Sequence, residues 1–175
     1  MFGYQHVFRL LPGRYFLRKG MSLWPPYWGA GIVVEAIRSD YRECTISLRD
    51  RLVNRNYFGT HFGGSLYAMT DPFFVLMVTR NIGSRYFVWD RAAQIEFIKP
   101  GTGHLRTVMH ISEAEIATIQ EATKGGSKWE GTFVAEVCDH KGELVAKVHK
   151  TVYVRLKPKY RPVHATAETR TPQPS

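Results

Sequence analysis

The sequence is poor in cysteine and has no long apolar run. Its only cysteines, Cys44 and Cys138, are too few for a disulfide framework or a structural zinc site, and each lies in a strand-like segment. We therefore expect two buried free thiols and no metal site. The longest uninterrupted apolar run covers 73–78, whereas a helix needs roughly 20 apolar residues to cross a bilayer. The sequence thus predicts no transmembrane segment.

The sequence also predicts neither a secretion signal nor a nucleic-acid-binding motif. Basic residues interrupt the apolar positions of the first 20 residues, unlike a signal peptide, so we expect a cytoplasmic protein. The net charge of +9 comes from the two ends, because residues 31–146 hold 13 of the 24 basic and 14 of the 15 acidic residues. Solvated charge at the ends explains this pattern, and we expect no nucleic-acid partner.

A chain of 175 residues with 44% hydrophobic residues can bury the core of one domain. We divide it into a basic, aromatic N-terminal arm (1–30), a folded domain (31–158) and a disordered tail (159–175). The arm has an amphipathic pattern that is interrupted at Pro12-Gly13, and we expect it to dock on the domain without being needed for the fold. A position on a membrane surface is the alternative for this arm.

Alternating and helical apolar patterns define the elements of the domain. Six segments are expected as strands: 31–39, 43–51, 85–99, 104–112, 129–138 and 143–156. A long apolar helix is expected at 63–80, and the S-x-x-E spacing of Ser112 and Glu115 is typical of a capping box that starts a short helix. This order predicts an α+β fold, in which a mostly antiparallel sheet covers one long helix.

An acidic residue interrupts the apolar stripe of the long helix. At 3.6 residues per turn, one stripe contains Tyr67, Ala68, Asp71, Phe74, Val75 and Val78. A carboxylate in such a row costs free energy unless it is hydrogen-bonded, lies in a wet cleft or is kept for function. Alternatively, Asp71 is an N-cap that restarts a broken helix, with Pro72 as its first residue.

The residues before this helix are candidates for a site. Gly63-Gly64 allows close approach to the backbone, and the free N–H groups at a helix start attract an anion or a carbonyl oxygen. The alternative interpretation is that the two glycines allow the helix to pack closely on the sheet. Asn56 is either functional or a turn residue, and His61 is either a general base or a hydrogen-bonded structural residue.

These residues resemble a pattern of the hotdog-fold thioesterases. The resemblance is to the phenylacetate-pathway type and to related uncharacterised families, including domain-of-unknown-function 4442-like proteins, and it covers about residues 31–156. In those proteins an Asn precedes a Gly-Gly pair that opens the central helix, and an acidic residue follows within the helix. The corresponding residues of this sequence are Asn56, Gly63-Gly64 and Asp71. Similar residues follow at Ala93, Ile95, Phe97, Pro100 and Gly103, and at Asp139, Gly142, Leu144, Val145 and Ala146. One departure is Phe62, where many members have the His directly before Gly-Gly.

The resemblance implies a hotdog fold, in which a curved antiparallel sheet wraps around one long central helix, and an acyl-CoA thioesterase. It implies that N–H groups near Gly63 and Gly64 bind the thioester carbonyl, and that Asp71 of the other subunit activates water or attacks directly. Asn56 would orient the water or the carboxylate. The remaining substrate-binding candidates are His61, Phe62, Ser65 and Tyr67. No metal or redox cofactor is implied, since coenzyme A arrives with the substrate, and we expect a homodimer or tetramer.

Two other functions remain open at this stage. A non-catalytic domain that binds or senses acyl-CoA would keep the same cleft without turnover. A hotdog dehydratase is favoured by His61-Phe62, but such enzymes pair the His with a helix Glu that segment 63–80 lacks. Aromatic residues such as Tyr57, Phe58 and Trp89 either line a pocket or belong to the core, so the sequence does not identify the acyl group.

Overall fold

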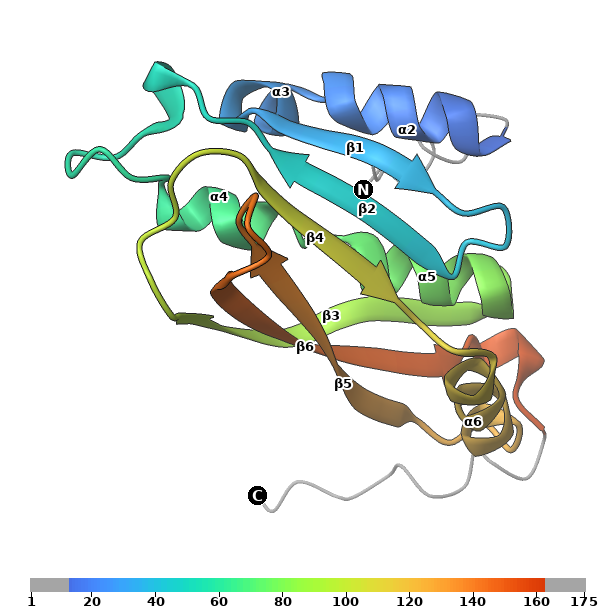
Figure 1. The fold of residues 1–175 in the computed structure, drawn as a ribbon. Helices are drawn as coiled ribbons and strands as arrows, with labels where there is room; N and C mark the ends of the chain where they lie inside the picture. The colour runs from blue at the N-terminus through green and yellow to red at the C-terminus, as the bar shows by residue number, and fades with distance from the viewer. Residues whose placement is uncertain (1–12, 163–175) are drawn as a thin grey trace, which may run out of the picture.

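A single antiparallel sheet organises the computed structural model, which describes residues 13–162. Its strands are β1 (Ile32–Ile37), β2 (Glu43–Leu48), β3 (Tyr86–Phe97), β4 (Leu105–His110), β5 (Trp129–Cys138) and β6 (Leu144–Leu156). Their order in the sheet is β1-β2-β4-β5-β6-β3, and every neighbouring pair is antiparallel (Figure 1). The six expected strands are therefore confirmed.

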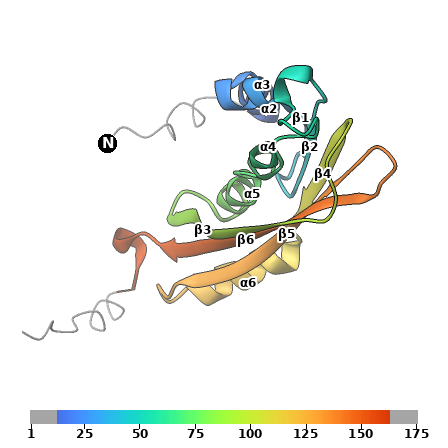
Figure 2. The same cartoon turned by 90° about the vertical axis from the view of Figure 1, so that its left-hand side faces the viewer.

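Two helices, α4 (Gly63–Ala68) and α5 (Phe73–Ile82), lie end to end along one face of the sheet, which curves around them (Figure 2). Alternating residues of the strands point at these helices, and Phe74 of α5 stacks on Phe133 of β5 with ring centroids 5.0 Å apart. Burial of such side chains supplies the main favourable term of folding. This arrangement confirms the predicted α+β class and the curved sheet around a central helical axis.

The central helix differs from the prediction in one respect, because it is interrupted between Met69 and Pro72. The Asp71–Pro72 peptide bond is cis, and proline has no N–H to continue the helical hydrogen bonds. Pro72 itself occupies the N-cap position of α5, where no side chain accepts a capping hydrogen bond. The predicted long central helix is therefore present as two consecutive segments, and Asp71 is not the N-cap that the alternative interpretation required.

Residues 13–30, assigned to the arm, form two helices that cover β1: α2 (Gly13–Leu23) and α3 (Pro25–Ala30). Leu17 and Met21 of α2 are buried in the same core as the sheet. Arg18 Nη1 donates to the Glu35 carbonyl at 2.7 Å, and Val34 N–H donates to Ser22 Oγ at 3.0 Å. Residues 13–30 thus dock on the sheet, and the expectation that the fold does not need the arm stays a prediction. Residues 1–12 and 163–175 lie outside the described residues, as do the corresponding parts of the predicted arm and tail.

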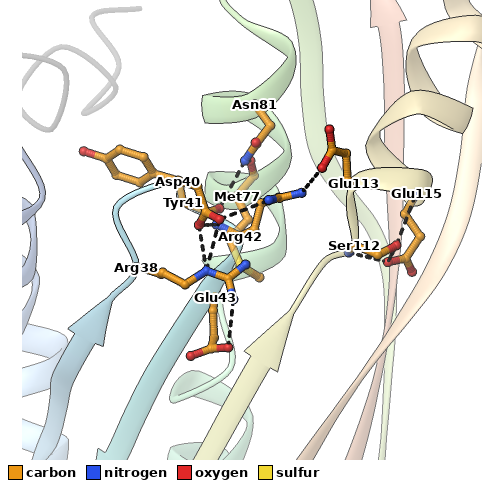
Figure 3. Close-up of polar contacts among 10 residues, drawn as sticks. All are labelled: Arg38, Asp40, Tyr41, Arg42, Glu43, Met77, Asn81, Ser112, Glu113 and Glu115. Carbon is orange, nitrogen blue, oxygen red and sulfur yellow. Dashed lines mark hydrogen bonds and ion pairs between the residues drawn. The ribbon is translucent and has the colours of Figure 1, made fainter.

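The turn between β1 and β2 is held by charged side chains (Figure 3). Arg38 and Arg42 both donate to the Asp40 carboxylate, and these hydrogen bonds lower the pKa of that exposed carboxyl group. Arg42 also pairs with Glu113 at the start of α6 (Glu113–Thr123), where the predicted capping box of Ser112 is present. Asn81 Nδ2 of α5 donates to the Tyr41 carbonyl. The turn thereby links the sheet to both helices at one end of the core.

Both cysteines are free, but only one is buried. Cys44 faces the core from β2, and burial raises the pKa of its thiol to about 12. Cys138 at the end of β5 is partly exposed, so the expectation of two buried thiols holds for Cys44 alone. Among residues 13–162, the structure has no helix with the length and apolar composition needed to cross a membrane.

Candidate functional site

A cavity of about 480 Å³ lies at the start of α4. It is lined by Gly29, Ala30, Val53, Asn54, Arg55, Asn56, Phe62, Gly64, Ser65 and Ala68. These residues come from the end of α3, from the segment between β2 and α4, and from α4 itself. The N–H groups in the first turn of a helix donate no hydrogen bond within the helix, because the residues four positions earlier lie outside it. The cavity therefore lies against the backbone that can supply hydrogen-bond donors.

Gly63 and Gly64 are both packed against aromatic rings. A Cβ atom at Gly63 would lie 3.0 Å from Cζ of Phe97, and one at Gly64 would collide with the ring of Phe62. Phe62 precedes the helix and is 60% exposed, so its ring forms part of the cavity rim. Of the two glycines, only Gly64 lines the cavity. Close packing accordingly explains Gly63, while Gly64 both packs against Phe62 and borders the cavity.

Asn56 lines the same cavity but uses its amide within its own turn. Its Nδ2 donates to Thr60 Oγ1 at 2.9 Å and to the His61 carbonyl at 3.3 Å. Its Oδ1 accepts the N–H groups of Phe58 and Thr60 at 2.9 and 3.2 Å. Both amide hydrogens are engaged, so one of these bonds would have to break before Asn56 could donate to a water or a carboxylate. Its clear structural effect is to shape the loop that leads into α4.

His61 is buried and does not line the cavity. Its Nε2 lies 2.6 Å from the Gly103 carbonyl, and its backbone N–H donates to the Gly101 carbonyl at 2.9 Å. These contacts attach the loop before α4 to the turn between β3 and β4. This geometry agrees with the alternative in which His61 is a hydrogen-bonded structural residue. Ser65, another candidate, is buried in the first turn of α4 and lines the cavity.

Tyr67 and Asp71 belong to a charged cluster on another side of the central axis. Asp71 Oδ1 accepts a hydrogen bond from Lys150 Nζ at 2.6 Å, and Tyr67 Oη lies 3.0 Å from the same ammonium group. Asp90 Oδ2 of β3 is 2.9 Å from Lys150 Nζ. Lys150 is only 1% exposed, whereas the Asp71 side chain is 42% exposed. The cluster thus runs from the buried face of β6 to the surface of the turn between α4 and α5.

Burial and ion pairing act in opposite directions in this cluster. Burial alone would lower the pKa of Lys150, but the hydrogen bonds to Asp71, Asp90 and Tyr67 outweigh it and raise that pKa above its ordinary value. The pKa of Asp90 is raised, and burial is the largest cause. The neighbouring Asp71 carboxylate raises this pKa further, whereas the Lys150 ammonium group lowers it in part. Lys150 therefore stays charged, and Asp90 binds a proton more readily than an exposed aspartate.

Comparison with known proteins identifies the family. Residues 13–154 match the family described as a domain of unknown function, DUF4442. The chain belongs to this family. No curated protein matches the chain.

Solved structures show the hotdog fold of this DUF4442 chain. It resembles Pseudomonas aeruginosa PA5026, described as a probable thioesterase, with a TM-score of 0.70 and 15% identity over 80% of this chain and 93% of that one. Haemophilus influenzae thioesterase HI1161 gives a TM-score of 0.60 at 11% identity, covering 87% and 94% of the two chains. Escherichia coli PaaI, from the phenylacetic acid degradation operon, gives 0.56 at 14% identity, covering 79% and 89%. Identities this low show a shared fold.

Within one chain of this DUF4442 protein, the predicted site residues form two groups. Asn56, Phe62, Gly64 and Ser65 line the cavity, whereas Tyr67 and Asp71 do not. Among residues 13–162, no three His, Cys, Asp or Glu side chains lie close enough together to hold a metal ion. The sequence argument missed Lys150 and Asp90. A signal was present, because Lys150 takes an inward position in the alternating segment 143–156, between Val148 and Val152.

Proposed function

We propose that this DUF4442 protein hydrolyses an acyl-CoA thioester to a free acid and coenzyme A. The observation that carries the proposal is the cavity against Gly64, where the first turn of α4 offers backbone donors beside an open space of about 480 Å³. A thioester carbonyl placed there would accept hydrogen bonds that strengthen as negative charge develops on its oxygen. The fold shared with thioesterases supports the same reaction class.

The proposed reaction uses Asp71 as the general base. Its carboxylate takes a proton from water, the resulting hydroxide forms a bond to the carbonyl carbon, and the carbon–sulfur bond then breaks. The proton on Asp71 passes to the departing thiolate, so free acid and free thiol leave together. The backbone N–H of Gly64 holds the oxyanion, Gly63 packs beside it, and Asn56 holds the loop before them. Phe62, Ser65 and Tyr67 border the substrate.

The proposed site needs a second copy of the chain, because Asp71 does not line the cavity of its own chain. β3 is an edge strand of 12 residues, and Trp89 and Phe97 on it are 45% and 57% exposed. Such a long edge with exposed aromatic residues favours pairing with another strand. We propose that pairing brings Asp71 of one copy to the cavity of the other.

We expect at least a dimer at micromolar concentration, because the composite site needs two copies. Sedimentation velocity of the full chain measures the assembly directly. A monomer throughout the micromolar range would contradict the composite site, even if the protein were active.

The test of the function is a panel of acyl-CoA thioesters with short, long and aromatic acyl groups. Release of free coenzyme A thiol, followed with a thiol-reactive dye, should exceed the rate without protein for at least one of them. Binding of an acyl-CoA without thiol release would favour the acyl-CoA binding or sensing alternative. The dehydratase alternative finds no support in the position of His61, whose ring is buried against the Gly103 carbonyl.

A further inference from the structure

Lys150 occupies a place where the strand pattern calls for an apolar side chain. Its neighbours on the inward face of β6, Val148 and Val152, are fully buried, and Lys150 itself is 1% exposed. A buried ammonium group costs free energy unless its hydrogen bonds are satisfied. Here its three N–H bonds have three acceptors: Asp71 Oδ1 at 2.6 Å, Asp90 Oδ2 at 2.9 Å and Tyr67 Oη at 3.0 Å. The lysine is thus fixed from three directions.

These contacts also fix the carboxylate of Asp71. Lys150 donates to one oxygen, Oδ1, from inside the core, and the Asp71 carboxyl group also lies beside that of Asp90. The backbone at Asp71 is held as well, since the Tyr27 hydroxyl group of α3 donates to its carbonyl oxygen. Asp71 is therefore a partly exposed carboxylate that is anchored through one side-chain oxygen and through its backbone.

Stability alone is a weak reason for this cluster. A well-packed apolar side chain often replaces a buried ion pair without loss of stability. The cluster also has an excess of acid, because Lys150 faces the two carboxylates of Asp71 and Asp90. Asp90 Oδ1 is buried and has no hydrogen-bond partner within the described part of the chain. An arrangement this costly is better explained by the exposed carboxylate that it holds in place.

We propose that Lys150 is a positioning residue for the hydrolysis, which orients the Asp71 carboxylate toward the attacking water while Asp90 and Tyr67 hold the ammonium group in place. This inference rests on the proposed function. Lys150 keeps its proton throughout, so it takes no part in bond making or breaking. Its effect is to hold the Asp71 carboxylate in one orientation through Oδ1, which favours the geometry of proton transfer.

The variant Lys150→Met tests this role, because Met keeps an unbranched apolar chain but removes the charge. We expect kcat for the best thioester to fall at least about tenfold with little change in KM, since orientation affects the reaction and not ground-state binding. A purely structural lysine would lower the melting temperature without lowering the kcat of the folded protein.

The variant Lys150→Met leaves two carboxylates without a cation and risks failing to fold. The double variant Lys150→Met/Asp90→Asn removes one of them and restores the net charge of the cluster, while Asp71 still lacks its lysine. It should fold as judged by circular dichroism and show the same loss of kcat with little change in KM. The matched control is Lys147→Met on the same strand, which removes a surface ion pair with Glu136 at 3.3 Å and should leave kcat and KM unchanged.

The outcomes separate the two hypotheses. If the parent protein hydrolyses a thioester and the folded double variant retains its kcat, Lys150 has no positioning role and the proposed function stands. If the parent protein releases no thiol from any thioester in the panel, the proposed function fails and this inference fails with it.

Discussion

Replacing Asp71 with Asn should lower the rate of thioester hydrolysis at least about a hundredfold, which is the lower range for a positioned acid–base group. Asn keeps the shape of the side chain and an oxygen that can still accept the hydrogen bond from Lys150 Nζ, now 2.6 Å from Asp71 Oδ1. It cannot take a proton from water. The measurement is free-thiol release from the best acyl-CoA, compared with the parent protein at the same pH.

The fold should survive this substitution. Asp71 is partly exposed and caps no helix, so the change removes a charge and leaves secondary-structure hydrogen bonds intact. A suitable control is Asp139→Asn, which makes the same chemical change in an ion pair with Lys99 at 2.8 Å, in the turn between β5 and β6. The control should keep the parent rate. An Asp71→Asn protein that hydrolyses its best thioester nearly as fast as the parent would exclude Asp71 as the base.

Local patterns in the sequence were sufficient to predict the sheet. Period-two alternation marks the strands because one face of each is buried, and the capping box at Ser112 needs only residues within one turn. The interruption of the central helix was harder to predict, since the apolar period continues through residue 71. Pro72 was the local signal, and only the alternative interpretation used it, as the first residue of a restarted helix, whereas it precedes α5 in the structure.

The charged cluster depends on contacts between distant segments, which a single sequence does not display. Asp71, Asp90 and Lys150 come from the central turn, β3 and β6, and the pairing of β3 with β6 and the packing of the helices on the sheet bring them together. Lys150 could have been noticed as a charged residue at an inward position, but its partners could not have been named. Asn56 shows the same limit. Its four hydrogen bonds lie within one turn and are local, but its position at the cavity depends on how distant segments pack together.

Helix α2 provides the second large expected effect. Leu17 is 1% exposed, and α2 is attached to β1 by the hydrogen bonds of Arg18 and Ser22. Leu17→Ala should lower the free energy of unfolding by about 2–5 kcal/mol, as buried leucines do when truncated to alanine. Urea unfolding measures this as a lower midpoint at an unchanged slope.

Phe16→Ala is the matched control for Leu17→Ala, because Phe16 is a larger apolar side chain on the same helix that is 54% exposed. Substitutions at the surface usually change the free energy of unfolding by no more than about 0.5 kcal/mol. If α2 belongs to the folded domain, Leu17→Ala should therefore be less stable than Phe16→Ala by at least about 1.5 kcal/mol, although leucine is the smaller side chain. Equal midpoints for the two variants would mean that α2 detaches at little cost. The arm would then be dispensable, as the sequence alone suggested, and the domain would begin near Gly31 in place of Gly13, where the family match begins.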